Sequence, residues 1–320
     1  MPEQNPHYDT SLTDEYVAAV NRVADVVHDF RNYMKDEQFG KESPEVVLVE
    51  NILKTSSKSG IEEQQEPMAF VVANVLTPAE CDALVEETEA FGIENRPSYT
   101  ARTAKRTKDY INKSLSEKVE ERIKDVLDSK FRDQGEKENN NESNLDDKKQ
   151  KLSYTKNPYM GKFYGIHSNW RILRYDAGDG SAFPAHFDQM DSLQIHRNDG
   201  SGRKDFCVSS HTLLVQLSET NLEGGATRFY PRAKANRLAK DNDHTFRREQ
   251  FDYSVDVVLP KGWAIAFRQR GLLHAGQPVL ASSPVSKYVA QAGILRLLPE
   301  GVLVKPSVFK NGPGVTKGAF

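Results

Sequence analysis

Two histidines and one aspartate are the residues of this sequence whose types and spacing point most clearly to a chemical function. In the sequence AHFD at 185–188, His186 and Asp188 are two positions apart, so on a β-strand both side chains point to the same face. A second histidine, His274, follows the apolar run at 263–267. Two imidazoles and one carboxylate on one face of a metal ion leave its other coordination positions open, as non-haem Fe(II) oxygenases require. The pattern therefore predicts a metal site made by His186, Asp188 and His274.

These residues lie in a part of the chain that is typical of β-structure. Short apolar, β-branched and aromatic runs alternate with turn sequences such as DAGDG, NDGSG and LPKG. The expected strands are 169–175, 185–190, 211–217, 226–230, 254–259, 263–267 and 288–298. Many short strands without alternating helices favour an antiparallel sandwich or barrel over a parallel sheet. We predict an α+β chain whose core is mainly β-structure.

Helices are expected before these strands. Apolar residues recur at steps of three and four over 11–34, which predicts an amphipathic helix that packs against the main domain. The sequence TPAE at 77–80 is a capping box for a helix that ends at about residue 92. The sequence SLSE at 114–117 predicts a second helix in the same way.

Two regions are expected to lie outside the compact core. The polar stretch at 133–156 has almost no apolar residues, so burial cannot offset its ordering entropy, and we expect a mobile surface insert. An N-terminal helical region with its linker, at 1–66, precedes one larger domain at 67–320.

The composition excludes several classes of protein. The chain has 320 residues, with 43 Lys plus Arg against 46 Asp plus Glu, so the formal net charge is −3. This balance gives no basic surface for nucleic acid or for a membrane, and we expect neither as a partner. The 2 cysteines exclude a disulfide scaffold. The start of the sequence lacks the pattern of a signal peptide, and no apolar run is long enough to span a membrane, so we expect a cytoplasmic protein.

Four blocks of the sequence resemble the prolyl 4-hydroxylase-like Fe(II)/2-oxoglutarate-dependent dioxygenase family. The blocks are ILRYDAGDGSAFPAHFD, HTLLVQLSETNLEGGATRFYP, LPKGWAIAFRQRGLLHAGQPV and SKYVAQAGILR. The segment FVVANVLTPAECDALVEETE is similar to the first strand and helix of the family. The resemblance extends from about residue 70 to residue 296. It implies a double-stranded β-helix, or jelly roll, flanked by N-terminal helices.

The resemblance also implies roles for single residues. Those that match the iron ligands of the family are His186, Asp188 and His274. Lys287 matches the basic residue that pairs with the C5 carboxylate of 2-oxoglutarate, and a fixed cation suits that carboxylate physically. Tyr175 matches a tyrosine that hydrogen-bonds the co-substrate, and Thr227 lies where a threonine on the co-substrate side is common.

One departure from the family leaves an alternative for the cation. The interval from His274 to Lys287 is thirteen residues, which is longer than usual in the family because of an apparent inserted turn at 282–285. Arg296, at the end of the same expected strand, is therefore a second candidate for the partner of the C5 carboxylate.

The activity implied by the resemblance is oxidation of an unactivated C–H bond. Fe(II), 2-oxoglutarate and O2 would take part, with succinate and CO2 as products, and ascorbate could serve as a reductant. The outcome could be hydroxylation, desaturation or oxidative cyclisation. The alternative is a non-catalytic jelly-roll binding protein with a vestigial metal site, which the intact set of three ligands and Lys287 disfavours.

Two kinds of substrate remain open. The family suggests a proline-containing peptide, and a small amino-acid-like molecule competes with it. Arg102 and Arg106, in the basic segment at 101–110, could bind a substrate carboxylate, although an exposed basic segment is more often simply solvated. The sequence gives no indication of the oligomeric state.

Overall fold

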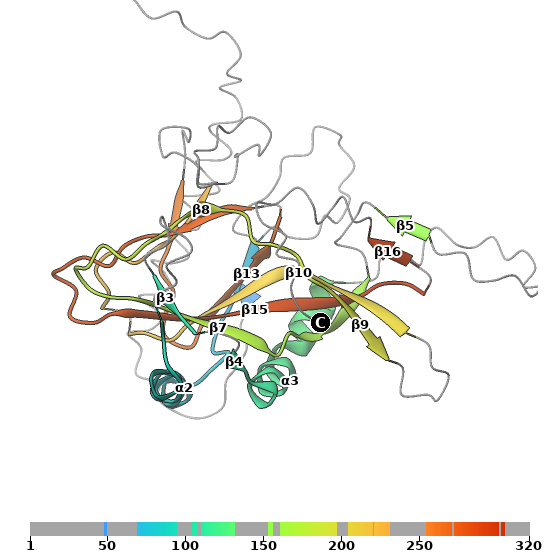
Figure 1. Ribbon diagram of the computed structural model, residues 1–320, viewed down its shortest axis with the longest axis horizontal. Helices are drawn as coiled ribbons and strands as arrows, with labels where there is room; N and C mark the ends of the chain where they lie inside the picture. Colours follow the sequence, from blue (N-terminus) through green and yellow to red (C-terminus); the bar gives the residue numbers. More distant parts are fainter. Residues whose placement is uncertain are drawn as a thin grey trace, which may run out of the picture.

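The structure is a computed structural model, shown in Figure 1. It describes residues 48–49, 69–94, 104–107, 110–131, 153–155, 161–196, 204–219, 221–230, 254–270, 272–300 and 302–304. The amphipathic helix expected at 11–34 and nearly all of the expected insert at 133–156 lie outside these residues.

A large antiparallel sheet forms one layer of the molecule. Its main path has the order β1-β2-β13-β10-β15-β7-β3, and β4, β6 and β9 pair at its sides. The strands along this path are β1 (Leu48–Val49), β2 (Ala69–Val72), β13 (Ala264–Arg268), β10 (Lys204–Gln216), β15 (Lys287–Leu297), β7 (Asn169–Tyr175) and β3 (Lys105–Arg106). The side strands are β4 (Tyr110–Ile111), β6 (Lys162–Ile166) and β9 (Ser192–His196).

A smaller sheet faces the large one across the interior. Its order is β12-β11-β14-β8, and its strands are β12 (Val255–Val257), β11 (Thr227–Tyr230), β14 (Leu273–Gly276) and β8 (Phe183–His186). Beginning at β7, the chain passes back and forth between the two sheets: β8, β11, β12 and β14 belong to the small sheet, and β7, β10, β13 and β15 belong to the large sheet. This strand order is a jelly roll, as the sequence predicted. A separate parallel pair is formed by β5 (Ser153–Thr155) and β16 (Val302–Val304).

Two helices cover the outer face of the large sheet (Figure 1). They are α2 (Pro78–Phe91) and α3 (Lys113–Lys130). The capping box of α2 forms as predicted: the Glu80 N–H donates to Thr77 Oγ1 at 3.2 Å, and the Thr77 N–H donates to Glu80 Oε2 at 2.9 Å. Arg122 of α3 pairs with the same Glu80 at 2.6 Å, which joins the two helices. Neither helix is long and apolar enough to cross a membrane.

Alternating side chains give the large sheet two apolar faces. On β2, Phe70 and Val72 pack with α2 and α3, whereas Ala69 and Val71 pack between the sheets with Phe229 of the small sheet. This alternation follows from the period of two along a strand. Part of the interior between the sheets is therefore filled by a packed apolar cluster.

Three predicted element boundaries are wrong. Helix α3 begins after Asn112, whose Oδ1 accepts the N–H of Leu115 at 2.8 Å, and not at the predicted box at 114–117. The strand expected at 185–190 is β8, which ends at His186, because the chain then leaves the small sheet to reach β9 in the large one. β10 is longer than expected, because its first half pairs with β9.

Candidate metal centre

The two histidines of the predicted site lie directly opposite each other on neighbouring strands. His274 of β14 is the register partner of His186 of β8. The Nδ1 atom of His186 lies 2.8 Å from the carbonyl oxygen of Pro184, and that of His274 lies 3.2 Å from the carbonyl oxygen of Leu272. A carbonyl oxygen only accepts, so Nδ1 of each ring carries the proton and Nε2 keeps its lone pair. Both histidines thus present a basic nitrogen that can bind a metal ion.

Asp188 completes the group from the segment that crosses between the sheets. Its Oδ1 lies 3.3 Å from Nε2 of His186, and its Oδ2 lies 3.7 Å from Nε2 of His274. In the large sheet, the hydroxyl of Thr212 donates to Oδ2 at 2.5 Å and the amide of Gln291 donates to it at 3.0 Å. Burial opposes its charge, but the two imidazoles and the Thr212 hydroxyl outweigh burial and hold the pKa of Asp188 well below its ordinary value.

The three side chains fit a divalent metal ion. One ligand atom from each lies within 4.8 Å of the others. Bonds of about 2.1 Å at right angles would place neighbouring ligand atoms about 3 Å apart, which is close to the two distances given above. Backbone carbonyls hold the two histidine rings, and side chains of the large sheet hold the Asp188 carboxylate; such bonds fix the orientation of metal ligands.

A buried lysine lies at one end of the interior. Lys287 is only 3% exposed. Its Nζ donates to the carbonyl of Gly225 at 2.5 Å and lies 3.4 Å from Thr227 Oγ1. Among the described residues, no carboxylate pairs with it, and burial lowers its pKa to about 7. A buried ammonium group without an anionic partner is costly, so this position suits an anion supplied by a ligand.

Tyr175 and Thr227 lie next to this lysine. Tyr175 is the register partner of Lys287, and the lysine Nζ lies 5.3 Å from the centre of its ring. The Tyr175 hydroxyl reaches β14, where a Cβ at Gly276 would lie only 2.4 Å from the hydroxyl oxygen. Gly276 is in turn the register partner of Thr227. The absence of a side chain at Gly276 therefore lets the tyrosine cross from the large sheet to the small one.

The alternative cation lies elsewhere. Arg296 is buried, and its Nε and Nη2 donate to the carbonyl of Gly161 at 3.0 and 2.5 Å. Its guanidinium carbon lies 4.8 Å from the centre of the Phe131 ring, at the end of β15 away from Lys287. The inserted turn at 282–285 does not carry the lysine into solvent, because Ser283 accepts the N–H of Glu223 and donates to the carbonyl of Val285.

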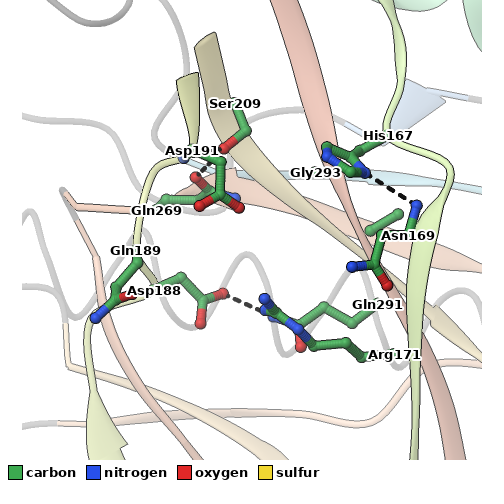
Figure 2. A pocket seen from close by; sticks show the side chains of 11 residues that line it. His167, Asn169, Arg171, Asp188, Gln189, Asp191, Ser209, Gln269, Gln291 and Gly293 are labelled. Carbon is green, nitrogen blue, oxygen red and sulfur yellow. Dashed lines mark hydrogen bonds between the residues drawn. The ribbon is translucent and has the colours of Figure 1, made fainter. Parts of the chain in front are cut away.

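A polar pocket adjoins the metal group on the side away from Lys287. Figure 2 shows the Asp188–Gln291 hydrogen bond at its base. Of the eleven described residues that line it, nine have polar side chains: His167, Asn169, Arg171, Asp188, Gln189, Asp191, Ser209, Gln269 and Gln291. Local sequence patterns did not single out His167, Asn169, Arg171 and Asp191 as site residues. The signal was present, since Asn169 and Arg171 stand six and four positions before Tyr175 and share its face of the strand.

The two arginines expected to bind substrate are not among the described residues that line this pocket. Arg106 is half-buried on β3, where it is the register partner of Leu173. Arg102 lies outside the described residues. Their role as substrate-binding residues stays a prediction.

Comparison with known proteins gives only distant structural similarity. No family model and no curated protein sequence matches the chain. It is similar to the viral collagen prolyl hydroxylase of Paramecium bursaria Chlorella virus-1, solved with 2OG, at 19% identity and a TM-score of 0.39, with 72% of this chain and 96% of that one covered. The epimerase SnoN from nogalamycin biosynthesis is described as α-ketoglutarate dependent. It has 14% identity and a TM-score of 0.44, with 79% of this chain and 88% of that one covered.

A third solved structure with a bound metal is similar at the same level. HygX from Streptomyces hygroscopicus, with nickel and 2-oxoglutarate bound, has 14% identity and a TM-score of 0.39, over 72% of this chain and 82% of that one. TM-scores of this size do not establish a common fold, so the jelly roll rests on the strand order of the chain itself.

Proposed function

We propose that the protein is an Fe(II)- and 2-oxoglutarate-dependent dioxygenase. The observation that carries the proposal is the combination of two sites inside one jelly roll. His186, Asp188 and His274 can hold a metal ion on one face, and Lys287 places a buried amine further along the same interior, without a carboxylate partner among the residues that the structure describes. A metal site alone would suit many functions, and a buried lysine alone would be unexplained. A ligand with a chelating end and a distant carboxylate accounts for both.

The spacing along β15 supports a ligand of this length. Lys287, Val289 and Gln291 alternate along the strand and share its inner face. At about 3.3 Å per residue, the Cα atoms of Lys287 and Gln291 are about 13 Å apart. The Gln291 side chain reaches Asp188, and the Lys287 side chain reaches Thr227. The proposal requires a five-carbon dicarboxylate to span from the metal group to the lysine ammonium.

Each of the site residues would have a separate role. The two imidazoles and the Asp188 carboxylate would hold the iron, and the Gln291 amide would keep that carboxylate oriented. Lys287, with the hydroxyl of Thr227 beside it, would donate to the C5 carboxylate of 2-oxoglutarate. Bound Fe(II) with its co-substrate supplies the redox chemistry, in which O2 and 2-oxoglutarate give succinate, CO2 and an oxidised substrate carbon.

The substrate of the proposed reaction is a prolyl residue of a peptide or a small amino-acid-like molecule. Its product would arise by hydroxylation, desaturation or oxidative cyclisation. The substrate would enter through the polar pocket, because this pocket reaches the metal group from the side that Lys287 leaves free.

Succinate formation from 2-oxoglutarate tests the proposal. The purified full chain with Fe(II) should form succinate, and His186→Ala or His274→Ala should abolish it while circular dichroism shows a retained fold. Lys113→Gln is the matched control, because this side chain is 81% exposed on α3 outside the sheets. A metal-loaded wild-type protein that binds 2-oxoglutarate and forms no succinate, with any substrate class offered, would indicate the non-catalytic binding protein instead.

A further inference from the structure

One wall of the polar pocket, formed by β7 and the residues just before it, presents a row of hydrogen-bond donors. His167, Asn169 and Arg171 alternate along the chain and all line the pocket. His167 Nδ1 accepts the backbone N–H of Asn169 at 2.9 Å, so in the neutral ring Nε2 carries the proton. Burial is the main reason that the pKa of His167 lies below its ordinary value, which favours this neutral ring. Within the described part of the chain, the Arg171 guanidinium makes no hydrogen bond or ion pair.

This donor wall lies close to the metal group. Arg171 is the register partner of Gln291, whose amide donates to Asp188. The Cβ atoms of directly opposed residues are about 5 Å apart, so an anion on Arg171 would lie about one side chain away from the metal ligands. Figure 2 shows Arg171 beside Gln291 and below His167 and Asn169.

The opposite wall of the pocket carries a carboxylate. Asp191 lies with Ser209 and Gln269 across the pocket from His167 (Figure 2). The Ser209 hydroxyl oxygen accepts the side-chain amide N–H of Gln269 at 3.0 Å and the backbone N–H of Asp191 at 2.8 Å. These bonds fix the Asp191 backbone and leave its carboxylate without an ion pair among the described residues. Donors on one wall and an acceptor on the other match a molecule with a carboxylate and an ammonium group.

We propose that the substrate is a free amino acid or a similarly small zwitterion, with its carboxylate on Arg171 and its ammonium group toward Asp191. This inference rests on the proposed function and chooses between its two substrate classes. An internal prolyl residue of a peptide carries neither charge, and its ring is apolar. The pocket offers few apolar contacts for such a ring, because only Ala292 and Gly293 of the described lining residues lack a polar side chain. Desolvating the polar groups without partners would disfavour such an occupant.

Binding in the absence of O2 tests this inference separately from turnover. The probes are the protein amino acids and their N-acetyl methylamides, which remove both charges while keeping the side chain. Each is titrated into the full chain loaded with Mn(II) and 2-oxoglutarate. At least one free amino acid should bind, and its capped form should bind about ten- to a hundredfold more weakly, the range expected for hydrogen bonds to charged groups.

Variants assign the effect to the two walls. Arg171→Gln and Asp191→Asn should each weaken binding of the free amino acid about ten- to a hundredfold and leave binding of its capped form unchanged. The affinity of Arg171→Lys should lie between those of Arg171→Gln and the wild type. Lys113→Gln removes the same charge outside the sheets and should change nothing. Binding of no free amino acid, equal binding of the capped forms, or an unchanged affinity in Arg171→Gln would overturn the inference. Titration of 2-oxoglutarate into the same samples reports on the proposed function alone, because its binding does not involve Arg171.

Discussion

His186 and His274 are register partners on β8 and β14, with their ring centres 4.4 Å apart. Strands β9 to β13 separate them along the chain. Each Nδ1 lies against the carbonyl two residues earlier, so the same local geometry is repeated on two neighbouring strands. Both basic nitrogens are therefore aimed at one point, and Asp188 reaches that point from the crossing between the sheets.

Replacement of Lys287 should impair co-substrate binding and leave metal binding intact. We expect Lys287→Ala to lower the affinity for 2-oxoglutarate by two to four powers of ten, since removing one partner of a buried charge pair costs about 3–5 kcal/mol. Lys287→Arg should recover part of the affinity, because a longer planar group replaces a compact one. Calorimetric titration of Mn(II)-loaded protein measures both affinities. A large loss in Arg296→Ala with no change in Lys287→Ala would contradict the assignment.

The same lysine should make stability depend on pH in the absence of 2-oxoglutarate. Burial lowers its pKa to about 7 from an ordinary value of 10.5, so between these values the unfolded chain binds the extra proton. The stability contribution of Lys287 therefore rises with pH across this window. Lys287→Met should be more stable than the wild type at pH 6, and the difference should shrink by pH 9. Urea unfolding at both values checks this, and a difference that is independent of pH would show that the lysine is not buried as a cation.

The hydrogen bonds to Asp188 should strengthen metal binding. Gln291→Leu and Thr212→Val each remove a donor to Oδ2, and we expect each to lower the affinity for Mn(II) about 10- to 100-fold. Because both donors bond the same oxygen, the double variant should lose less than the sum of the two effects. Unchanged Mn(II) affinity in both single variants would mean that the ligand is oriented by other contacts.

A side chain at Gly276 should disturb the co-substrate end of the interior. A Cβ there would lie 2.4 Å from the Tyr175 hydroxyl oxygen, so Gly276→Ala must displace the tyrosine. We expect a loss of about 1–3 kcal/mol in the free energy of unfolding together with weaker 2-oxoglutarate binding. Adding Tyr175→Leu, which removes the ring, should restore part of the stability but not the binding. Thermal unfolding decides the matter, and a Gly276→Ala variant as stable as the wild type would show that the two strands separate easily.

The sequence predicted the parts of this structure that depend on local patterns. The His-x-Asp spacing, the strand at 169–175 and the capping box at Thr77 all depend on neighbouring residues, and the structure contains each of them. The end of β8 at His186 was not predictable in this way, because it depends on where the chain crosses between sheets.

The polar pocket was missed for the same physical reason. Arg171 becomes a site residue only through its register with Gln291, which is 120 positions later in the chain. Strand register is set by tertiary packing, so a single sequence read by local patterns does not reveal it.

The proposed function requires one molecule of 2-oxoglutarate to bridge the metal group and Lys287. Calorimetry with 2-oxoglutarate, 2-oxobutyrate, which lacks the far carboxylate, and glutarate, which lacks the keto group, tests it most directly. We expect tight binding of 2-oxoglutarate only with Mn(II) bound, and binding that is about tenfold or more weaker for each analogue. We also expect Lys287→Met to bind 2-oxoglutarate no better than the wild type binds 2-oxobutyrate. Equal affinity for 2-oxoglutarate with and without metal, or in Lys287→Met and the wild type, would contradict a bridge between the metal group and Lys287.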